Sequence, residues 1–452
     1  MTTNLLWLRR DLRRRDHPAL AAAAAGGAEV IPVAVLDPAE WAGAAQLGWR
    51  AATLAATAKV YDDRLCLRHG DPAEALLALA RETGAAAVHA TGETDPGGRH
   101  RDAVVARRLR AEGIGWVATG TPHAVDPGSL HTLAGTPYRV FTPFAKAWRA
   151  RGWPAPAPQP DRLRLVGAPS DAAAVALLDR WRTDCPIELP EAGEPAAVTA
   201  WDGFRADRLS GYADTRDRPD LDTTSRLSPH LALGTLHPRT LLADLADAVG
   251  AGPGKFVSEL AWREFHADLL WHHPGSLAED LTPALAGLAY DEPDERLAAW
   301  RQGRTGYPLV DAGLRQLLAE GWMHNRVRMV AASFLVKDLH LAWQHGARHF
   351  REHLIDFDPA SNTHNWQWVA GTGADAAPYP RVFNPVTQSE ALDPAGEYVR
   401  RHLPELAHLA GSAALRPWDR PDGYAHGYPP RIVDHAFERL EALTRQRLAV
   451  RR

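Results

Sequence analysis

The first 120 residues alternate between two kinds of segment, and this alternation restricts the possible folds more than any other feature of the chain. Short apolar runs bounded by turn residues are typical of buried strands, and the Ala- and Leu-rich stretches between them have helical periodicity. The apolar runs are NLLWLRR, VIPVAVLD, RLCLRHGD, AAVHATGE and GWVATG. We therefore predict an N-terminal Rossmann-like α/β domain with a five-stranded parallel sheet between helices.

The rest of the chain changes character twice. Between about 150 and 200 it is rich in proline, as in GWPAPAPQPDRLRL, which is typical of a long connector. Beyond it strand patterns fade and helical periodicity dominates, and seven of the sixteen tryptophans lie between Trp262 and Trp368. We predict an α/β domain over residues 1–130, an interdomain linker over 131–200 and an all-helical domain over 201–452.

Composition limits the class of protein. The formal net charge of −4 argues against a chain that is basic overall and binds nucleic acid for that reason. Only four of the 51 basic residues are lysines; arginine favours bidentate contacts with phosphate, although a GC-rich genome explains the same bias. Cys66 and Cys185 fit no metal-ligand spacing and exclude a cysteine-ligated iron–sulfur cluster. Without an apolar run of about 20 residues or a secretory signal pattern, we expect a cytoplasmic protein that makes no contact with a membrane.

The segment GWMHNRVRMVAASF, residues 321–334, predicts a helix boundary. Gly321 is expected to end one helix, and the next begins around His324. Asn325 and Met329 then share a face of the second helix, with Arg328 beside them. Either this face binds a ligand with mixed polar and soft apolar character, or the helix is capped by asparagine and its arginines face solvent.

The stretch LIDFDPASN brings two carboxylates close together at Asp356 and Asp358. Two buried carboxylates need cationic partners, and Arg326 and Arg328 are the candidates. An Asp-x-Asp pair also ligates metals, but no nearby His, Cys or Glu set completes a site, so no metal is expected.

Two further segments have both a structural and a functional interpretation. In TTSRLSPHLALG, hydroxyls at Thr223, Thr224, Ser225 and Ser228 precede a helix, where they form either an N-cap or a phosphate-binding site. In ELAWREF, Glu259 is four residues before Arg263, which is typical of a salt bridge on an amphipathic helix that also carries Trp262.

Together and in this order the segments resemble the photolyase/cryptochrome family, and within it the class I bacterial DNA photolyases. The similar motifs are LLWLRRDLRRRDHPAL, TSRLSPHLALG, ELAWREF, GRTGYPLVDAGLRQLLAEGWMHNRVRM, SFLVKDL and NWQWVAGTGADAAPYPRVFNPVTQ. The likeness covers essentially the whole chain. It implies an antenna-chromophore α/β domain, a helical FAD-binding domain, and light-driven repair of cyclobutane pyrimidine dimers, a carbon–carbon lyase reaction.

The resemblance implies that the helical domain binds FAD in a U-shaped conformation. No G-x-G-x-x-G follows the first strand, and this mode of binding needs none. Residues 224–228 match positions that hold the FAD phosphates, and Asn362 matches the residue that faces flavin N5. The cofactor-binding residues that the resemblance implies are Tyr212, Thr224, Ser225, Arg226, Leu227, Ser228, Arg328, Asp356, Phe357, Asp358 and Asn362.

The implied substrate is a dimer flipped out of UV-damaged DNA, and photolyases are among the enzymes that flip a base out of the duplex. Trp262 and Trp368 match the aromatic walls of the lesion pocket. Contacts to the DNA backbone supply affinity that is independent of base sequence. The DNA- and lesion-binding residues implied are Arg216, Glu259, Trp262, Arg263, Asn325, Arg326, Met329, Trp368, Arg381 and Gln388.

Trp366 and Trp368 lie two positions apart, which on a helix is about 200° of rotation, so their indoles face nearly opposite ways. The resemblance implies that Trp366 lies against the flavin and begins an electron path to the surface through Trp343. The third carrier of the family is usually tryptophan and falls here on Tyr290, which puts rapid photoreduction of oxidised flavin in doubt.

In the implied reaction, excited FADH⁻ donates an electron to the dimer, the cyclobutane bonds break, and the electron returns. Glu259 is expected to hydrogen-bond the dimer and, if protonated, to stabilise its radical anion. The catalytic residues implied are Glu259, Asn325, Met329 and Asn362.

Two other functions are alternatives to the repair of cyclobutane dimers. A (6-4) photolyase typically has histidines where Asn325 and Met329 stand, and a cryptochrome photoreceptor often has a longer C-terminal tail, so both are less favoured.

The antenna chromophore expected is 8-hydroxy-5-deazaflavin, with a methenyl-folate as the alternative. Arg50, Glu93 and Asp95 fall near positions that deazaflavin-binding members use, but solvated loop charges explain them equally well. We expect a monomer.

Overall fold

The computed structural model describes residues 2–37, 43–160, 162–285, 287–374 and 381–450. The chain packs into two compact units, each with its own interior. Unit 1 comprises residues 1–210 and 225–274, and unit 2 comprises residues 211–224 and 275–452. The domain limits at 130 and 200 stay a prediction, because these units follow packing density and not the role of each segment.

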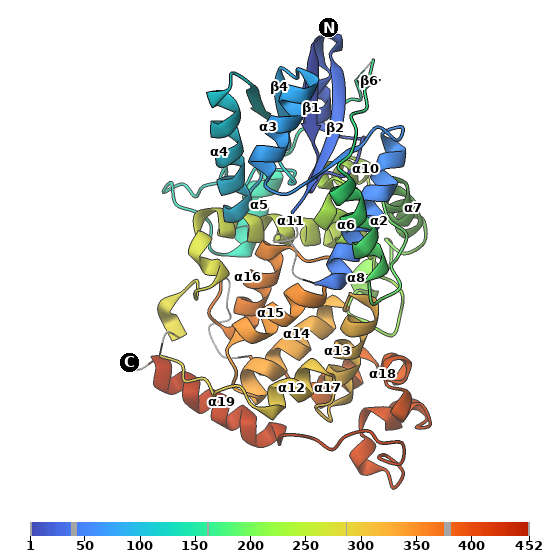
Figure 1. Ribbon diagram of the computed structural model, residues 1–452. Coiled ribbons are helices and arrows are strands. Elements are labelled where there is room, and N and C mark those ends of the chain that lie inside the picture. The colour runs from blue at the N-terminus through green and yellow to red at the C-terminus, as the bar shows by residue number, and fades with distance from the viewer. Residues whose placement is uncertain (1, 38–42, 161, 286, 375–380, 451–452) are drawn as a thin grey trace. The chain divides into compact units, whose positions relative to one another are not determined.

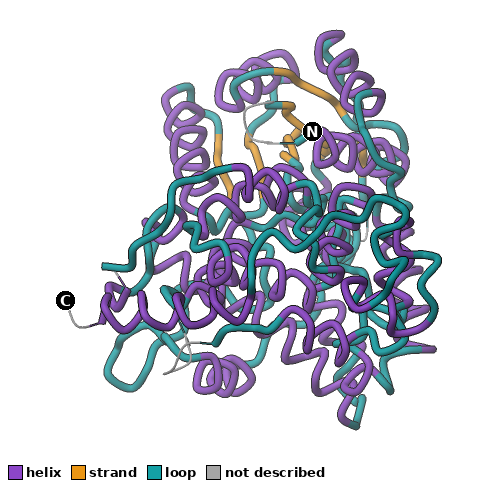
Figure 2. Tube along the Cα trace, turned by 90° about the horizontal axis from the view of Figure 1, so that it is seen from below, coloured by secondary structure: helices purple, strands orange, loops and turns teal. Residues whose placement is uncertain are grey.

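Unit 1 contains a parallel sheet in the strand order β3-β2-β1-β4-β5, as the alternating pattern predicted. A two-residue strand, β6, adds to β2 and was not predicted. All strands of the described residues belong to this unit (Figure 2). Their bounds are Thr3–Trp7 for β1, Glu29–Leu36 for β2, Cys66–His69 for β3, Ala87–Ala90 for β4, Gly115–Ala118 for β5 and Arg164–Leu165 for β6.

Helices cover both faces of the sheet. Leu5 and Trp7 of β1 are buried in a cluster with residues of α3 and α4, two helices that lie side by side (Figure 1). On the opposite face, the Asn4 side chain donates a hydrogen bond to the Ala23 carbonyl of α1. Residues on both faces of β1 are therefore buried, which explains why its sequence is almost continuously apolar. The helices of unit 1 are α1 Pro18–Ala23, α2 Ala44–Val60, α3 Pro72–Thr83, α4 Pro96–Ala111, α5 Phe141–Arg151, α6 Ala172–Thr183, α7 Glu194–Asp207, α9 Ser228–Leu233, α10 Pro238–Asp244 and α11 Ala251–His272.

The proline-rich connector is an ordered part of unit 1. It contains α5, α6 and β6, and it buries Trp148 and Trp181 almost completely. At the start of α7 the Glu194 carboxylate accepts hydrogen bonds from the backbone N–H groups of Arg14 and Arg15, at 2.8 and 2.9 Å. These contacts fix the connector to the loop that follows β1.

Unit 2 is helical, as predicted for the C-terminal part of the chain. Gly321 has φ +62° and ends α13, and His324 caps α14, so the predicted helix boundary is confirmed. The helices are α8 Tyr212–Thr215, α12 Glu295–Arg301, α13 Pro308–Glu320, α14 Asn325–Ser333, α15 Trp343–His353, α16 Pro359–Ala370, α17 Pro385–Leu392, α18 Glu397–His402 and α19 His435–Val450, with a π-helical turn η5 at Phe334–Asp338. Among the described residues, no helix combines the length and apolar character that a membrane crossing requires.

The helical periodicity of residues 325–344 does not produce one continuous α-helix, because α14 ends at Ser333. The chain widens into the π-helical turn η5, and His340 adopts φ +55°. Two buried polar groups explain the change: Lys337 donates to the Ala370 carbonyl at 2.7 Å, and Asp338 pairs with Nδ1 of His435 at 2.5 Å. Because these partners come from α16 and α19, tertiary contacts and not local propensity determine the backbone here.

Candidate functional site

Helix α14 carries the polar and soft apolar residues that the sequence placed on one face. Nδ1 of the cap, His324, accepts a hydrogen bond from the Arg326 N–H at 3.2 Å. Burial lowers the pKa of His324 to about 4, so its ring is a neutral acceptor at neutral pH. Asn325 is exposed, and Arg328 and Met329 are half-buried. The helix therefore presents an amide and a thioether at the surface of unit 2.

Arg328 forms the ion pair that was predicted for it. Its Nη2 donates to Oδ2 of Asp356 at 2.8 Å, and its Nε donates to the Met323 carbonyl at 2.8 Å. The Asp356 side chain is only 2% exposed, and its Oδ1 has no hydrogen-bond partner among the described residues. A buried carboxylate oxygen of this kind is an acceptor for a donor group of a ligand, and an N–H of a flavin ring fits it.

Arg326, the other cation predicted to pair with Asp356 or Asp358, forms an ion pair with Asp217. Its Nη2 donates to Asp217 at 2.7 Å, and its Nη1 lies 3.6 Å from the sulfur of Met329. Burial acts to raise the pKa of Asp217, but the hydrogen bond and charge of Arg326 outweigh it and hold that pKa below the ordinary value. The contact joins α14 to residues more than 100 positions earlier, and no local pattern indicates it.

The residues after Asp356 organise the start of α16. Asp358 is the N-cap and accepts a hydrogen bond from the Ser361 N–H at 2.8 Å. The Asn362 side chain donates to the Ala347 carbonyl of α15 at 3.1 Å, which orients its amide. Phe357 is half-buried against the core of unit 2.

The two neighbouring indoles of α16 lie in different surroundings. Trp366 is 2% exposed and packs edge-on against Trp300 and Phe350, with ring centroids at 6.2 and 5.0 Å. Its Nε1 is buried with no hydrogen-bond partner among the described residues. Trp368 touches the same core cluster but is half-buried, and the guanidinium of the exposed Arg381 lies 5.6 Å from its ring. The different surroundings of the two indoles agree with the expectation that they face different ways.

One carboxylate interacts with both other predicted electron carriers. The indole N–H of Trp343, the first residue of α15, donates to Oδ1 of Asp280 at 2.8 Å. Burial, followed by the charge of Asp280, raises the pKa of Tyr290 well above its ordinary value. The Tyr290 hydroxyl is buried with no hydrogen-bond partner among the described residues.

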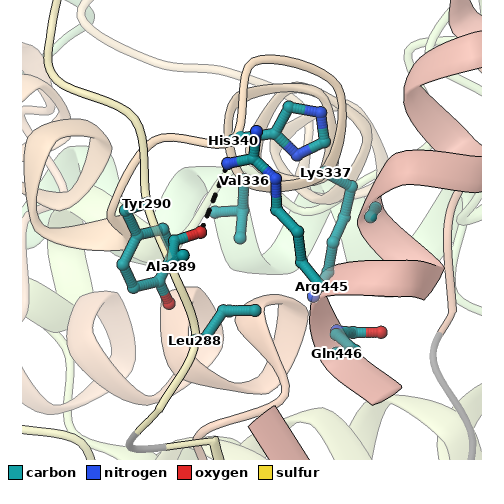
Figure 3. A pocket seen from close by; sticks show the side chains of 9 residues that line it. Leu288, Ala289, Tyr290, Val336, Lys337, His340, Arg445 and Gln446 are labelled. Atoms are coloured by element: carbon teal, nitrogen blue, oxygen red, sulfur yellow. Dashed lines mark hydrogen bonds between the residues drawn. The ribbon is translucent and has the colours of Figure 1, made fainter. Parts of the chain in front are cut away.

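Tyr290 lines a cavity of about 10 Å³, close to the size of one water molecule. Figure 3 shows Arg445 of α19 reaching across it to the Ala289 carbonyl, at 3.3 Å. The cavity is lined by Leu288, Ala289, Tyr290, Val336, Lys337, His340, Ala442, Arg445 and Gln446.

Within unit 1, α11 holds Trp262 against a second aromatic ring. Trp262 stacks on Phe141 of α5, with centroids 3.7 Å apart and planes 6° apart. Arg263 donates to the Pro122 carbonyl at 3.1 Å, and Glu259 forms an ion pair with Lys255 at 3.4 Å. Phe141 covers one face of the indole and was not predicted, since the two residues lie on different helices far apart in sequence.

The predicted phosphate-binding segment is a tight turn before α9. Arg226 has φ +49°, and the Ser225 hydroxyl accepts a hydrogen bond from the Leu227 N–H at 3.4 Å. The N-cap of α9 is Leu227, whose side chain has no acceptor, and Ser228 is the first helical residue. Because Arg226 and Ser228 are exposed, this turn is accessible for the phosphate-binding role that the sequence offered beside the N-cap.

The other predicted residues of unit 2 lie in or near α8 and α17. The guanidinium of Arg216 lies 5.8 Å from the ring of the buried Tyr212. Thr224 and Gln388 are half-buried. Residues 375–380 of the motif that carries Trp366 lie outside the described residues.

Two of the three predicted antenna residues, Glu93 and Asp95, follow strand β4, and the third, Arg50, lies on helix α2. Glu93 follows β4, is buried, and lies 3.8 Å from Nε of Arg9, which follows β1. Burial raises the pKa of Glu93 against the lowering effect of the arginines around it. Asp95 caps α4, and buried Arg50 donates to the Arg9 carbonyl at 3.1 Å. The carboxyl ends of β1 and β4 are the switch point of this sheet, where α/β proteins commonly bind ligands.

Comparison with known proteins adds to this geometry. Residues 4–161 match the family model described as DNA photolyase, and residues 256–447 match that of the FAD-binding domain of DNA photolyase. A deoxyribodipyrimidine photo-lyase of Agrobacterium fabrum is 38% identical over 464 residues, which cover 97% of this chain and 96% of the relative.

Solved structures give the same result. A class III photolyase from Agrobacterium tumefaciens has a TM-score of 0.91 and 36% identity, covering 100% of this chain and 98% of that one. A Synechocystis cryptochrome has a TM-score of 0.87 and 26% identity, covering 98% of each chain. Membership of class I stays a prediction. On the family models and the full-length similarity, the chain belongs to the DNA photolyase family.

Proposed function

We propose that the chain repairs cyclobutane pyrimidine dimers in DNA by light-driven electron transfer from reduced FAD, the reaction of a deoxyribodipyrimidine photo-lyase. The observation that carries the proposal is the layout of α14 and α16 in unit 2. There the buried Asp356 oxygen and the Trp366 N–H have no hydrogen-bond partners within the part of the chain that the structure describes, while Asn325 and Trp368 reach the surface. Family membership supplies the rest of the support.

The residues present fit FAD. Asp356, held by Arg328, would accept from the flavin ring, and the Asn362 amide would lie at its reacting edge. The turn at residues 224–228 would hold the phosphates through hydroxyl and backbone N–H groups. When bound and reduced, FAD supplies the electron that light transfers to the dimer.

The chain's own residues would bind and orient the damaged bases. Trp262 and Trp368 each supply an aromatic face, and Asn325 and Met329 supply an amide donor and a polarisable contact. Amide and thioether groups do not exchange protons at neutral pH, which favours cyclobutane dimers over (6-4) photoproducts, whose repair needs proton transfer. Arg216, with the other residues implied for the backbone, would bind phosphates independently of sequence. Those residues are Arg326, Arg381 and Gln388.

The proposal is tested by illuminating the reduced, FAD-loaded protein with oligonucleotides that contain either a cyclobutane dimer or a (6-4) photoproduct. Light-dependent restoration of the cyclobutane substrate alone is the expected result. Repair of the (6-4) substrate alone, or of neither with FAD bound, would replace the proposal by a (6-4) photolyase or a cryptochrome.

Glu259 is expected to act by hydrogen bonding. Glu259→Gln keeps a donor and an acceptor and should retain much of the repair yield per absorbed photon, whereas Glu259→Ala should lose more. Quantum yields measured at saturating substrate separate this effect from binding. Equal yields for the two variants would show that Glu259 does not contact the dimer.

Trp262 is expected to contribute by stacking. Trp262→Ala should weaken binding of a dimer-containing oligonucleotide in the dark by about 1–3 kcal/mol, or about 5- to 150-fold in Kd. Phe141→Ala should give a smaller loss, because Phe141 holds the indole from its other face. Phe437→Ala, which removes a ring that is 66% exposed on α19, is the matched control and should leave Kd unchanged. An unchanged Kd for Trp262→Ala would remove this residue from the lesion site.

An antenna chromophore is proposed at the carboxyl ends of β1 and β4, with 8-hydroxy-5-deazaflavin favoured over a methenyl-folate. The buried charges of Arg50 and Glu93 support a polar ligand there. The absorption spectrum of protein purified from its native host distinguishes the two. The monomeric state and the cytoplasmic location stay predictions.

A further inference from the structure

The last turn of α15 carries a cluster of three potential metal ligands. One imidazole nitrogen each from His349 and His353 and one carboxylate oxygen from Glu352 all lie within 4.8 Å of one another. The two rings are 4.4 Å apart between centroids. The sequence, H-x-x-E-H, places them at i, i+3 and i+4 on one helical face, a spacing that zinc enzymes use.

His349 is the most buried of the three residues, and one of its ring nitrogens has no hydrogen-bond partner among the described residues. His349 is 3% exposed, and its Nε2 is buried with no hydrogen-bond partner among the described residues. A buried ring nitrogen without a partner is an atom that can ligate a metal ion.

The second histidine is held in a suitable tautomer. Nδ1 of His353 lies 2.9 Å from the His349 carbonyl, to which it donates when it carries the proton. Donation to a backbone carbonyl leaves Nε2 as the lone-pair nitrogen and fixes the ring, as in many metal sites. Glu352 is exposed and His353 is half-buried, so the cluster is open to solvent for entry of an ion.

The position on the helix also favours a cation. α15 ends at His353, and the partial negative charge of a helix C-terminus is concentrated in its last turn. Arg301 opposes this effect, but the carboxylate of Glu352 adds a full negative charge to the cluster.

From this geometry we propose that His349, Glu352 and His353 bind a divalent transition-metal ion, for which Zn²⁺ is the best match. Two imidazoles and one carboxylate are a ligand set of zinc sites that keep a fourth position for water. Imidazole ligands favour Zn²⁺, Cu²⁺ and Ni²⁺ over Mg²⁺ and Ca²⁺, which prefer oxygen ligands only. The site contradicts the expectation that no His, Cys or Glu set near Asp356 and Asp358 completes a metal site, since the H-x-x-E-H run ends three positions before Asp356.

The site is tested by titrating full-length protein, free of any histidine tag and treated with a chelator, with ZnCl₂ in a calorimeter. One Zn²⁺ per chain is expected, with MgCl₂ giving no heat of binding. His353→Gln and Glu352→Gln each remove an outer ligand and should weaken Zn²⁺ binding at least about tenfold, since even the loss of a supporting residue costs a metal site that much. His349→Gln should do the same, and circular dichroism checks that this buried substitution leaves the fold intact.

His345→Gln is the matched control, because His345 lies one turn earlier on α15 and outside the cluster. It should leave Zn²⁺ affinity unchanged. The proposal is overturned if no saturable binding of one Zn²⁺ occurs, or if the His353→Gln and Glu352→Gln variants bind as tightly as the parent. Loss of affinity in His345→Gln equal to that in His353→Gln would overturn the assignment of these three ligands. None of these outcomes depends on the repair activity.

Discussion

Replacing Arg328 by methionine is expected to produce a protein that is purified with little FAD and unfolds at a markedly lower urea concentration. The substitution leaves the Asp356 carboxylate, 2% exposed, without its cationic partner. Removing one partner of a buried ion pair typically destabilises a protein by about 3–5 kcal/mol. The same change leaves nothing to hold Asp356 in place for the flavin, so cofactor content should fall with stability.

A double variant separates these two effects. Arg328→Met combined with Asp356→Leu removes both charges and should recover most of the lost stability, because an apolar pair of similar volume often replaces a buried ion pair without loss. It should still fail to bind FAD, since the acceptor oxygen of Asp356 is gone. Stability is compared on FAD-stripped proteins, with Arg348→Met, an exposed arginine of α15, as the control. Full FAD content in the double variant would show that Asp356 does not contact the cofactor.

The parts of the fold that the sequence predicted are those determined by local patterns. The five main strands follow from apolar runs that are buried on both faces, and the end of α13 follows from a glycine with positive φ at Gly321. The pairing of Arg328 with Asp356 was expected because two close buried carboxylates need cationic partners, for which Arg326 and Arg328 were the candidates.

The contacts that were missed join residues far apart in sequence. Asp217 accepts a hydrogen bond from Arg326, which was a candidate partner of Asp356 and Asp358. Phe141 stacks on Trp262. Asp338 pairs with His435 where the end of α14 widens into η5. In each case the two partners lie on different segments far apart in sequence, so no pattern within one segment indicates the contact. Such contacts depend on which elements the tertiary fold brings together, and propensity gives way to them.

Packing also explains the position of Trp366, one of the two tryptophans of α16. The indole of Trp366 lies where Gly346 leaves room on α15, since a Cβ at that glycine would be 2.0 Å from the ring. A substitution there would displace the indole, so the glycine and the tryptophan form one structural unit. Trp343 begins α15, the helix of Gly346, and α15 packs against α16. Two of the three predicted electron carriers, Trp343 and Trp366, therefore lie on one packed pair of helices.

Tyr290→Trp is expected to photoreduce oxidised flavin about ten- to a hundredfold faster than the parent protein, while Tyr290→Phe should barely photoreduce it. Oxidising a tyrosine at neutral pH requires its proton to leave. The pKa of Tyr290, which burial raises, and the absence of a hydrogen-bond acceptor among the described residues oppose this. A polar group buried without a partner carries a penalty of about 1–3 kcal/mol, and each 1.4 kcal/mol is tenfold in rate. Tryptophan loses an electron without needing to lose its proton, so it avoids most of that barrier.

The rate is followed as bleaching of flavin absorption under blue light with an external reductant present. Trp343→Phe should abolish photoreduction in both the parent and the Tyr290→Trp background, because its indole lies beside the Asp280 carboxylate that stabilises a positive charge. Repair by chemically reduced protein should be the same in all five proteins, since that electron goes to the dimer and not along this path. If Tyr290→Phe photoreduces as fast as the parent, the electron leaves Trp343 by another route and Tyr290 is a structural residue.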